Sequence, residues 1–243
     1  MANNFFQFKQ FIVYQQHCAM KVSTDSCIFG ATAAAFFADD PKLINTDKRY
    51  LDIGTGTGLL SLMLAQQTTA AIDAVEIDNA AFEQATQNFS ASSFSNQLAA
   101  LHTDVLQFEP GKKYNGILCN PPFFEGDLQS GNAMKNAAKH STTFTLQQLL
   151  TTADRLLTSD GILAVLLPYH RVDAFIQSAN DLQFYLQQQI LLRHTPAHPY
   201  FRGILFLSRQ QSTAHTKELV IKNEGNAYTD AFIDLLQDYY LQL

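Results

Sequence analysis

Short apolar runs alternate with amphipathic segments through the middle of the chain. Five apolar runs have the length of strands: "YLDI", "AAIDAVEI", "LAALHT", "YNGILC" and "GILAVLL". The segments "GLLSLMLAQQ", "NAAFEQATQNFSA" and "TLQQLLTTADRLL" lie between them and repeat apolar residues at helical spacing. This alternation predicts an α/β protein with a parallel sheet and helices on both faces.

The two ends of the chain follow other patterns. Residues 5–15 alternate imperfectly and predict short strands, and residues 23–38 predict an alanine-rich helix capped by Ser23, Thr24 or Asp25. Later, "FYLQQQILLRH" and "RGILFLS" predict a hairpin joined by "TPAHPYF". "KELVIK" is compatible with one more strand, and "YTDAFIDLLQDYYL" predicts a closing amphipathic helix.

Length and composition favour one globular domain. The chain has 243 residues, of which 47% are hydrophobic and 16% charged. We expect residues 1–243 to form a single domain, with residues 1–49 as a short N-terminal extension. No apolar stretch approaches the ~18 residues that span a bilayer, and the start lacks signal-peptide features. The three cysteines show no C-x-x-C spacing, and the histidines are dispersed. We therefore expect a reduced, cytoplasmic, monomeric protein without a metal or membrane partner.

A glycine-rich loop follows the first predicted strand of the sheet. "LDIGTGTGLL" sets Gly54, Gly56 and Gly58 between a strand and a helix, where glycines permit a tight turn and close ligand approach. The spacing differs from the G-x-G-x-x-G of nicotinamide enzymes, and Asp52 beside the loop would repel a pyrophosphate. The pattern favours a ligand with an ammonium group and no phosphate, such as S-adenosyl-L-methionine. An ordinary strand-to-helix turn is the alternative.

Two further acidic residues stand where strands end. Glu76 ends the second predicted strand, about where a carboxylate would reach ribose hydroxyls. Asp104 follows the third strand and can accept a hydrogen bond from an adenine amino group, while Val105 can pack on the ring. A solvated turn aspartate is the alternative for Asp104.

The fourth strand leads into "NPPFF". Pro121 and Pro122 make this segment stiff and project its side chains in set directions. An amino nitrogen conjugated to a ring is a poor nucleophile and needs acceptors that hold it toward a methyl group. The Asn120 side chain and the Pro121 carbonyl would be such acceptors, and Phe123 would stack on a planar substrate. The alternative is a rigid turn with a core phenylalanine.

These motifs carry a family resemblance. "DIGTGTG" resembles the first motif of class I methyltransferases, and "NPPF" resembles the (Asn/Asp/Ser)-Pro-Pro-aromatic motif of enzymes that methylate exocyclic or amide nitrogen. With "QHCAMKVSTDSCIFGA", "AKHS" and "YTDAFIDLLQDYYL", nearly the whole chain resembles the tRNA(Val) adenine-N6 methyltransferases, which modify the adenine 3′ of the anticodon. The resemblance implies a Rossmann-like fold, with a mostly parallel seven-stranded sheet and an antiparallel C-terminal hairpin.

The resemblance also implies ligands and residue roles. It implies S-adenosyl-L-methionine as cofactor, the tRNA anticodon loop as partner, and an N-terminal extension that packs over the cofactor site through Lys21, Thr24 and Asp25. It implies that the substrate is bound by Phe124, Lys139, His140 and Arg202. The net charge of −6 argues against a broad basic surface. A local phosphate-binding rim, or else a scatter of solvated charges, is compatible with Lys135, Lys139, His140, Arg171, Arg193 and Arg202.

Three other functions compete with this one. Protein-glutamine N5 methyltransferases use the same motif, but usually have tyrosine where Phe123 stands and a longer N-terminal helical domain. A non-catalytic RNA-binding module on the same fold would not need the intact "NPPF". A nicotinamide oxidoreductase is disfavoured by the glycine spacing and by Asp52.

Overall fold

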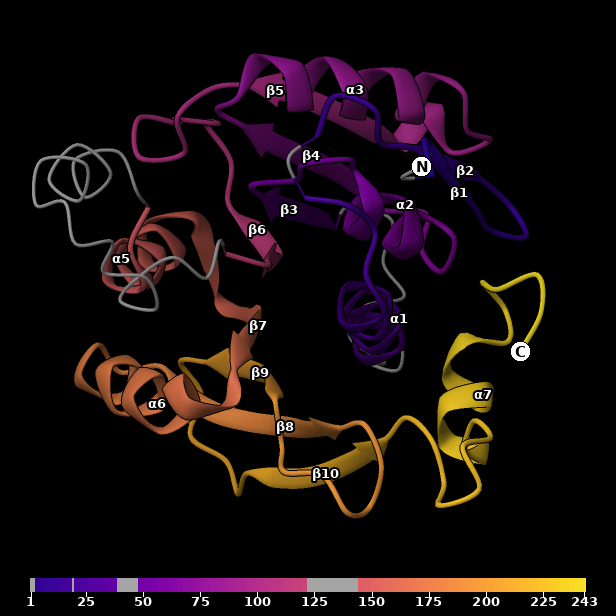
Figure 1. The fold of residues 1–243 in the computed structure, drawn as a ribbon. Helices are drawn as coiled ribbons and strands as arrows, with labels where there is room; N and C mark the ends of the chain where they lie inside the picture. Colours follow the sequence, from indigo (N-terminus) through magenta and orange to yellow (C-terminus); the bar gives the residue numbers. More distant parts are fainter. Residues whose placement is uncertain (1–2, 19, 39–47, 122–143) are drawn as a thin grey trace, which may run out of the picture.

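The computed structural model describes residues 3–18, 20–38, 48–121 and 144–243. Its main sheet has the strand order β10-β8-β9-β7-β6-β3-β4-β5, which runs from bottom to top in Figure 1. Among the described strands of this sheet, only β9 runs against its neighbours, β7 and β8. The strands are β3 (Arg49–Ile53), β4 (Ala71–Glu76), β5 (Leu98–His102), β6 (Tyr114–Cys119), β7 (Leu157–Pro168), β8 (Tyr185–Arg193), β9 (Arg202–Ser208) and β10 (His215–Val220).

This topology confirms the mostly parallel sheet and the antiparallel hairpin, which β8 and β9 form. The expected number of strands differs by one, because the described sheet has eight strands rather than seven. The additional strand is β10, which joins the edge beside β8 in parallel. Leu219 is the one buried residue of β10, so the strand carries little of the hydrophobic alternation by which strands are recognised.

Helices cover both faces of the sheet, as predicted. Helices α5 and α6 pack on one face, and α1, α2, α3 and α7 contribute to the apolar cluster on the other. In Figure 1 α5 and α6 lie to the left of the sheet, and α1, α2 and α7 to the right. The bounds are α1 (Thr24–Ala38), α2 (Leu59–Ala65), α3 (Asn79–Ser90), η2 (Ser95–Gln97), α5 (Leu146–Leu156), η3 (Tyr169–Arg171), α6 (Val172–Asp181) and α7 (Asp230–Leu236).

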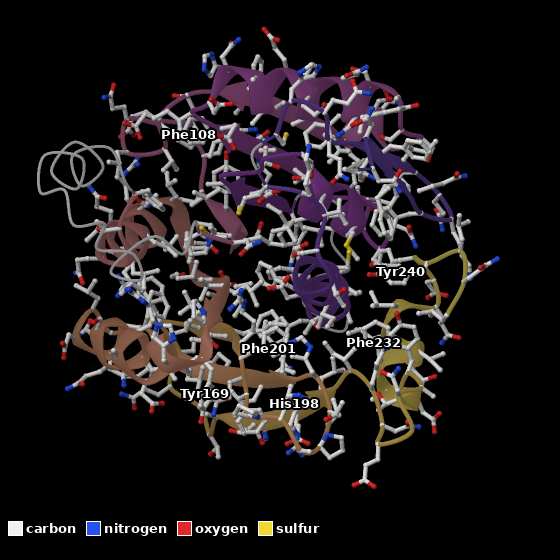
Figure 2. All side chains as sticks on the ribbon, viewed as in Figure 1. Phe108, Tyr169, His198, Phe201, Phe232 and Tyr240 are labelled. Atoms are coloured by element: carbon white, nitrogen blue, oxygen red, sulfur yellow. The ribbon has the colours of Figure 1, made fainter. Side chains whose placement is uncertain are left out.

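The two ends of the chain pack against each other. The N-terminal hairpin of β1 (Phe5–Gln7) and β2 (Ile12–Tyr14) confirms the predicted short strands. Helix α7 is shorter than expected because the chain turns after Leu236: the Lys9 N–H donates to the Tyr239 carbonyl at 2.8 Å, and Tyr240 pairs with Phe8. Tyr240 also lies edge-on to Phe232, and both are labelled in Figure 2.

The packing of the N-terminal hairpin against the C-terminal segment predicts how two substitutions affect stability. Phe8 is 1% exposed, so Phe8→Ala should lower the free energy of unfolding by about 3–5 kcal/mol. Phe5 lies on the same hairpin and is 42% exposed, so Phe5→Ala should change it by less than about 0.5 kcal/mol. Urea titration measures both values. Equal effects would place Phe8 outside the core, and two separate transitions would contradict the prediction that residues 1–243 form one domain.

Candidate active site

Many of the predicted site residues gather at one edge of the sheet. Strands β3, β4, β5 and β6 run parallel, so their carboxyl ends meet at the same edge. A cleft of about 620 Å³ opens there, a volume typical of small-molecule sites. Its walls come from the loops after these strands, from Cys18 and Met20 of the N-terminal segment, and from Phe144 and Gln148 at the start of α5.

The glycine loop has the backbone that the sequence predicts. Gly54, Gly56 and Gly58 have φ values of 68°, 57° and 81°, which side chains rarely adopt. Gly58 is doubly constrained, because an added Cβ would lie 2.4 Å from Cε1 of Phe89. Gly54 and Gly56 line the cleft and have open space where a Cβ would stand. A ligand can therefore approach the backbone of this loop closely.

Asp52 lies beneath the loop. It is fully buried, and its Oδ2 accepts hydrogen bonds from the hydroxyls of Thr55 at 2.6 Å and Ser61 at 2.8 Å. Burial raises the pKa of Asp52 to about 6, although these hydroxyls oppose the rise. Oδ1 has no hydrogen-bond partner among the described residues. The carboxylate thus shapes the loop from below, and direct contact between Asp52 and a ligand stays a prediction.

Glu76 joins two loops and also lines the cleft. Its Oε2 accepts from the Gly56 N–H at 2.9 Å, and its Oε1 accepts from the N–H groups of Ile77 at 2.9 Å and Asp78 at 3.0 Å. A carboxylate offers about four lone-pair sites, so three bonds leave capacity for a ligand hydroxyl. The predicted position of Glu76 at the end of its strand is confirmed.

Exposed apolar side chains line the mouth of the cleft. Met20, Ile77 and Leu106 are 47%, 66% and 40% exposed, and all three line the cleft. Buried Val105 and half-buried Asp104 lie beside them, and Asp104 Oδ1 accepts from the Leu106 N–H at 2.9 Å. Converging exposed apolar groups commonly mark a binding site. An apolar slot next to a carboxylate suits a planar heterocycle that carries an amino group.

The charged residues among the described lining of the cleft are all acidic. Glu76, Asp78 and Asp104 line it, and none of its described lining residues is lysine or arginine. A pyrophosphate would meet these carboxylates without a counter-charge, whereas a cationic ligand would be attracted. This arrangement favours an ammonium or sulfonium ligand over a dinucleotide.

Asn120 and Pro121 follow β6 and line the same cleft. Asn120 Oδ1 is buried and has no hydrogen-bond partner among the described residues. An unsatisfied buried acceptor costs about 1–3 kcal/mol, so this oxygen is suited to a donor from a substrate. Five other predicted site residues lie outside the described residues: Pro122, Phe123, Phe124, Lys139 and His140.

Besides Asp52 and Gly58, which do not line the cleft either, four predicted residues lie away from its described walls. Lys21 Nζ donates to the Gln15 carbonyl, and Thr24 begins α1. Asp25 accepts from Arg202 Nε at 2.9 Å, which ties the start of α1 to the start of β9. The structure thus joins Asp25 and Arg202, for which the sequence predicted separate roles. Direct contacts of these four residues with a cofactor or substrate stay predictions.

Comparison with known proteins is consistent with this geometry. The model of the methyltransferase small-domain family matches residues 32–176. The tRNA1(Val) (adenine(37)-N6)-methyltransferase of Flavobacterium psychrophilum is 37% identical over 241 residues, which cover 98% of this chain and 100% of the relative. The protein of the same name from Pectobacterium carotovorum is 38% identical, with 97% and 93% covered.

Solved structures share the fold. A predicted O-methyltransferase from Agrobacterium tumefaciens superposes with a TM-score of 0.62 at 18% identity, covering 84% of this chain and 95% of its own. A ribosomal protein L11 methylase from Lactobacillus delbrueckii gives a TM-score of 0.51 at 16% identity, with 73% and 77% covered. At these identities the likeness concerns the fold alone.

One residue that the sequence analysis missed, Asn88, connects the N-terminal segment to the glycine loop. Asn88 is fully buried on α3. Its Nδ2 donates to the carbonyls of Tyr14 and Thr57, both at 2.8 Å, and its Oδ1 accepts from the Tyr14 N–H at 2.9 Å. Gln84, one turn earlier and 1% exposed, accepts from the Gln16 N–H. The sequence did contain a signal for these residues: Gln84 and Asn88 are amides four residues apart, on the same helix face as the buried Ala81 and Ala85.

Asn88→Ala should lower the free energy of unfolding by about 2–4 kcal/mol, because it leaves one buried and two partly buried backbone groups unpaired. It should also free the segment that carries Cys18 and Met20, so trypsin should cleave after exposed Lys21 faster than in the wild type. Thr86→Ala, an exposed change on the same helix, is the control. Unchanged stability and cleavage in Asn88→Ala would remove this residue from the support of the cleft.

Proposed function

The chain belongs to the methyltransferase small-domain family and, within it, to the tRNA1(Val) (adenine(37)-N6)-methyltransferases, and we propose that it methylates N6 of adenine 37 in the anticodon loop of valine tRNA. The methyl donor is S-adenosyl-L-methionine. The observation that carries the proposal is Asn120 Oδ1, a buried acceptor without a partner among the described residues at the edge of an acidic cleft.

The cleft fits the proposed cofactor in three respects. Ile77 and Leu106 offer apolar surface to an adenine ring, and Asp104 offers an acceptor for its amino group. Glu76 keeps lone pairs for the ribose hydroxyls. The excess of carboxylates suits the cationic sulfonium and ammonium groups. When bound, S-adenosyl-L-methionine supplies an electrophilic methyl group that an amine can attack directly.

The residues after β6 would prepare the adenine for this attack. Asn120 Oδ1 and the Pro121 carbonyl accept the two N–H bonds of the amino group, which directs its nitrogen lone pair toward the methyl group. The amino nitrogen would bond to the methyl carbon as the carbon–sulfur bond of the donor breaks, so that S-adenosylhomocysteine leaves and the nitrogen releases one proton to solvent. We propose that Phe123 stacks on the extruded base, and that Phe124, Lys139, His140 and Arg202 contact the RNA.

The sequence similarity favours adenine over a protein glutamine as the acceptor, since tRNA1(Val) (adenine(37)-N6)-methyltransferases match nearly end to end. We also propose that the enzyme is cytoplasmic and monomeric and that it needs no metal ion. Among the described helices, none has both the length and the apolar character required to cross a bilayer.

Removing Glu76 should weaken cofactor binding. Glu76→Ala should lower affinity for S-adenosylhomocysteine about 10- to 100-fold, because hydrogen bonds to a charged carboxylate contribute about 1.5–3 kcal/mol. Glu76→Gln keeps one acceptor and should lose less. Exposed Glu83 on α3 provides the control, Glu83→Ala. Calorimetry measures each affinity. Equal binding by all four proteins would remove Glu76 from the site, and tighter binding of NAD would contradict the cofactor.

Asn120 should act on the chemical step. Asn120→Ala should lower kcat by about 100- to 1000-fold with little change in KM for tRNA, because its hydrogen bond strengthens as the nitrogen pyramidalises. Asn120→Asp keeps an acceptor and should retain more activity. The assay is methyl transfer from labelled cofactor to unmodified valine tRNA, with N6-methyladenosine identified in the product. A fully active Asn120→Ala that only melts earlier would make this segment a structural turn.

A further inference from the structure

An aromatic cluster lies on the same sheet edge as Asn120, beyond the cleft. Its members come from η3 after β7 and from residues 194–201, the loop between β8 and β9. Strands β7 and β8 run in the same direction as β6, and Arg202 pairs with both Pro168 and Leu192, so both segments leave the sheet at this edge. The cluster comprises Tyr169, His194, His198, Tyr200 and Phe201, of which Figure 2 labels Tyr169, His198 and Phe201.

The rings of this cluster support one another. The ring centroids of Tyr169 and Tyr200 are 5.3 Å apart, and the Tyr169 N–H donates to the Phe201 carbonyl at 3.1 Å. His194 stacks on Phe201 with centroids 4.1 Å apart and an interplanar angle of 8°, and His198 lies edge-on to His194. Tyr169, His194 and His198 are nevertheless exposed. The rings are therefore held in place by their neighbours and still expose surface on which a ligand can pack.

One ion pair lies beneath the cluster. The Arg193 guanidinium lies 5.6 Å from the centre of the Tyr200 ring and forms an ion pair with Glu218 at 2.5 Å. The Tyr200 hydroxyl also donates to Glu218, and this bond, together with Arg193, holds the pKa of Glu218 below its ordinary value. No aspartate or glutamate occurs from residue 182 to residue 217, although the chain has 22 acidic residues. A polyanion would meet little repulsion here.

We propose that this aromatic cluster binds unpaired bases of the anticodon loop that flank the target adenine, by stacking on Tyr169, His194 and His198. The inference rests on the proposed function and names the surface that holds the RNA beside the reacting base. Unpaired bases stack on aromatic and histidine rings irrespective of sequence. Extruding the target adenine unstacks its neighbours, which then need a new surface. Because Arg193 is already paired with Glu218, we expect the RNA to contact this surface by base stacking rather than through its phosphates.

The test compares two RNAs and three variants. Fluorescence anisotropy gives Kd for an unmodified valine anticodon stem–loop and for the paired stem alone. Tyr169→Ala should bind the stem–loop about 5- to 100-fold more weakly, with the paired stem unaffected. Its salt dependence should match that of the wild type, because no charge is removed. Tyr169→Phe should bind like the wild type. Phe5→Ala is the matched control, since Phe5 and Tyr169 are both 42% exposed.

Affinity for S-adenosylhomocysteine should be the same in all these proteins. The inference would be overturned if Tyr169→Ala bound the stem–loop with wild-type affinity. It would also be overturned if the variant lost affinity for the stem–loop and the paired stem equally. In both cases the proposed function would stand if the wild type methylates tRNA. A wild type that binds the stem–loop but methylates no tRNA would overturn the proposed function and this inference together.

Discussion

The carboxylate of Glu76 bonded to three backbone N–H groups is the interaction on which the cleft depends. One oxygen holds Gly56 in the loop after β3, and the other holds Ile77 and Asp78 in the loop after β4. Charge-assisted bonds of this kind are roughly twice as strong as neutral ones. They fix two loops relative to each other at the point where a ligand must fit between them. The group that shapes the site thus also lines it.

Helix α3 supports this arrangement from behind. Phe89 packs where any side chain at position 58 would stand, so the glycine loop lies directly on the helix. Asn88 binds the Thr57 carbonyl and both backbone groups of Tyr14. Asp78 caps the helix by accepting from the Ala81 N–H. The glycine loop, the N-terminal segment and the second acidic loop therefore share one rigid support, which suits a site that must be preorganised.

Much of this was predictable because the signals are local. Strand–helix alternation, positive-φ glycines and acids at strand ends can all be read within a few residues, and Gly54, Gly56, Glu76, Asp104, Val105 and Asn120 do line one cleft. Long-range contacts were not predictable in this way. Asp25 and Arg202 are distant in sequence yet form an ion pair, and Asn88 acts through partners on two other segments. Edge strand β10, for which the sequence was only compatible with a strand, gave little hydrophobic pattern because its first four residues are exposed on both faces and only Leu219 is buried.

Chemically, the site combines an excess of negative charge with an acceptor that has no partner among the described residues. The negative charge favours a cationic methyl donor, and the acceptor, Asn120 Oδ1, is suited to an amino group. Mass spectrometry of nucleosides from valine tRNA, purified from cells with and without this chain, tests the combination most directly. The account predicts that N6-methyladenosine next to the anticodon disappears without the chain and returns with the wild type but not with a folded Asn120→Ala variant. An unchanged methylation level, or loss of a methylated glutamine in a protein instead, would contradict it.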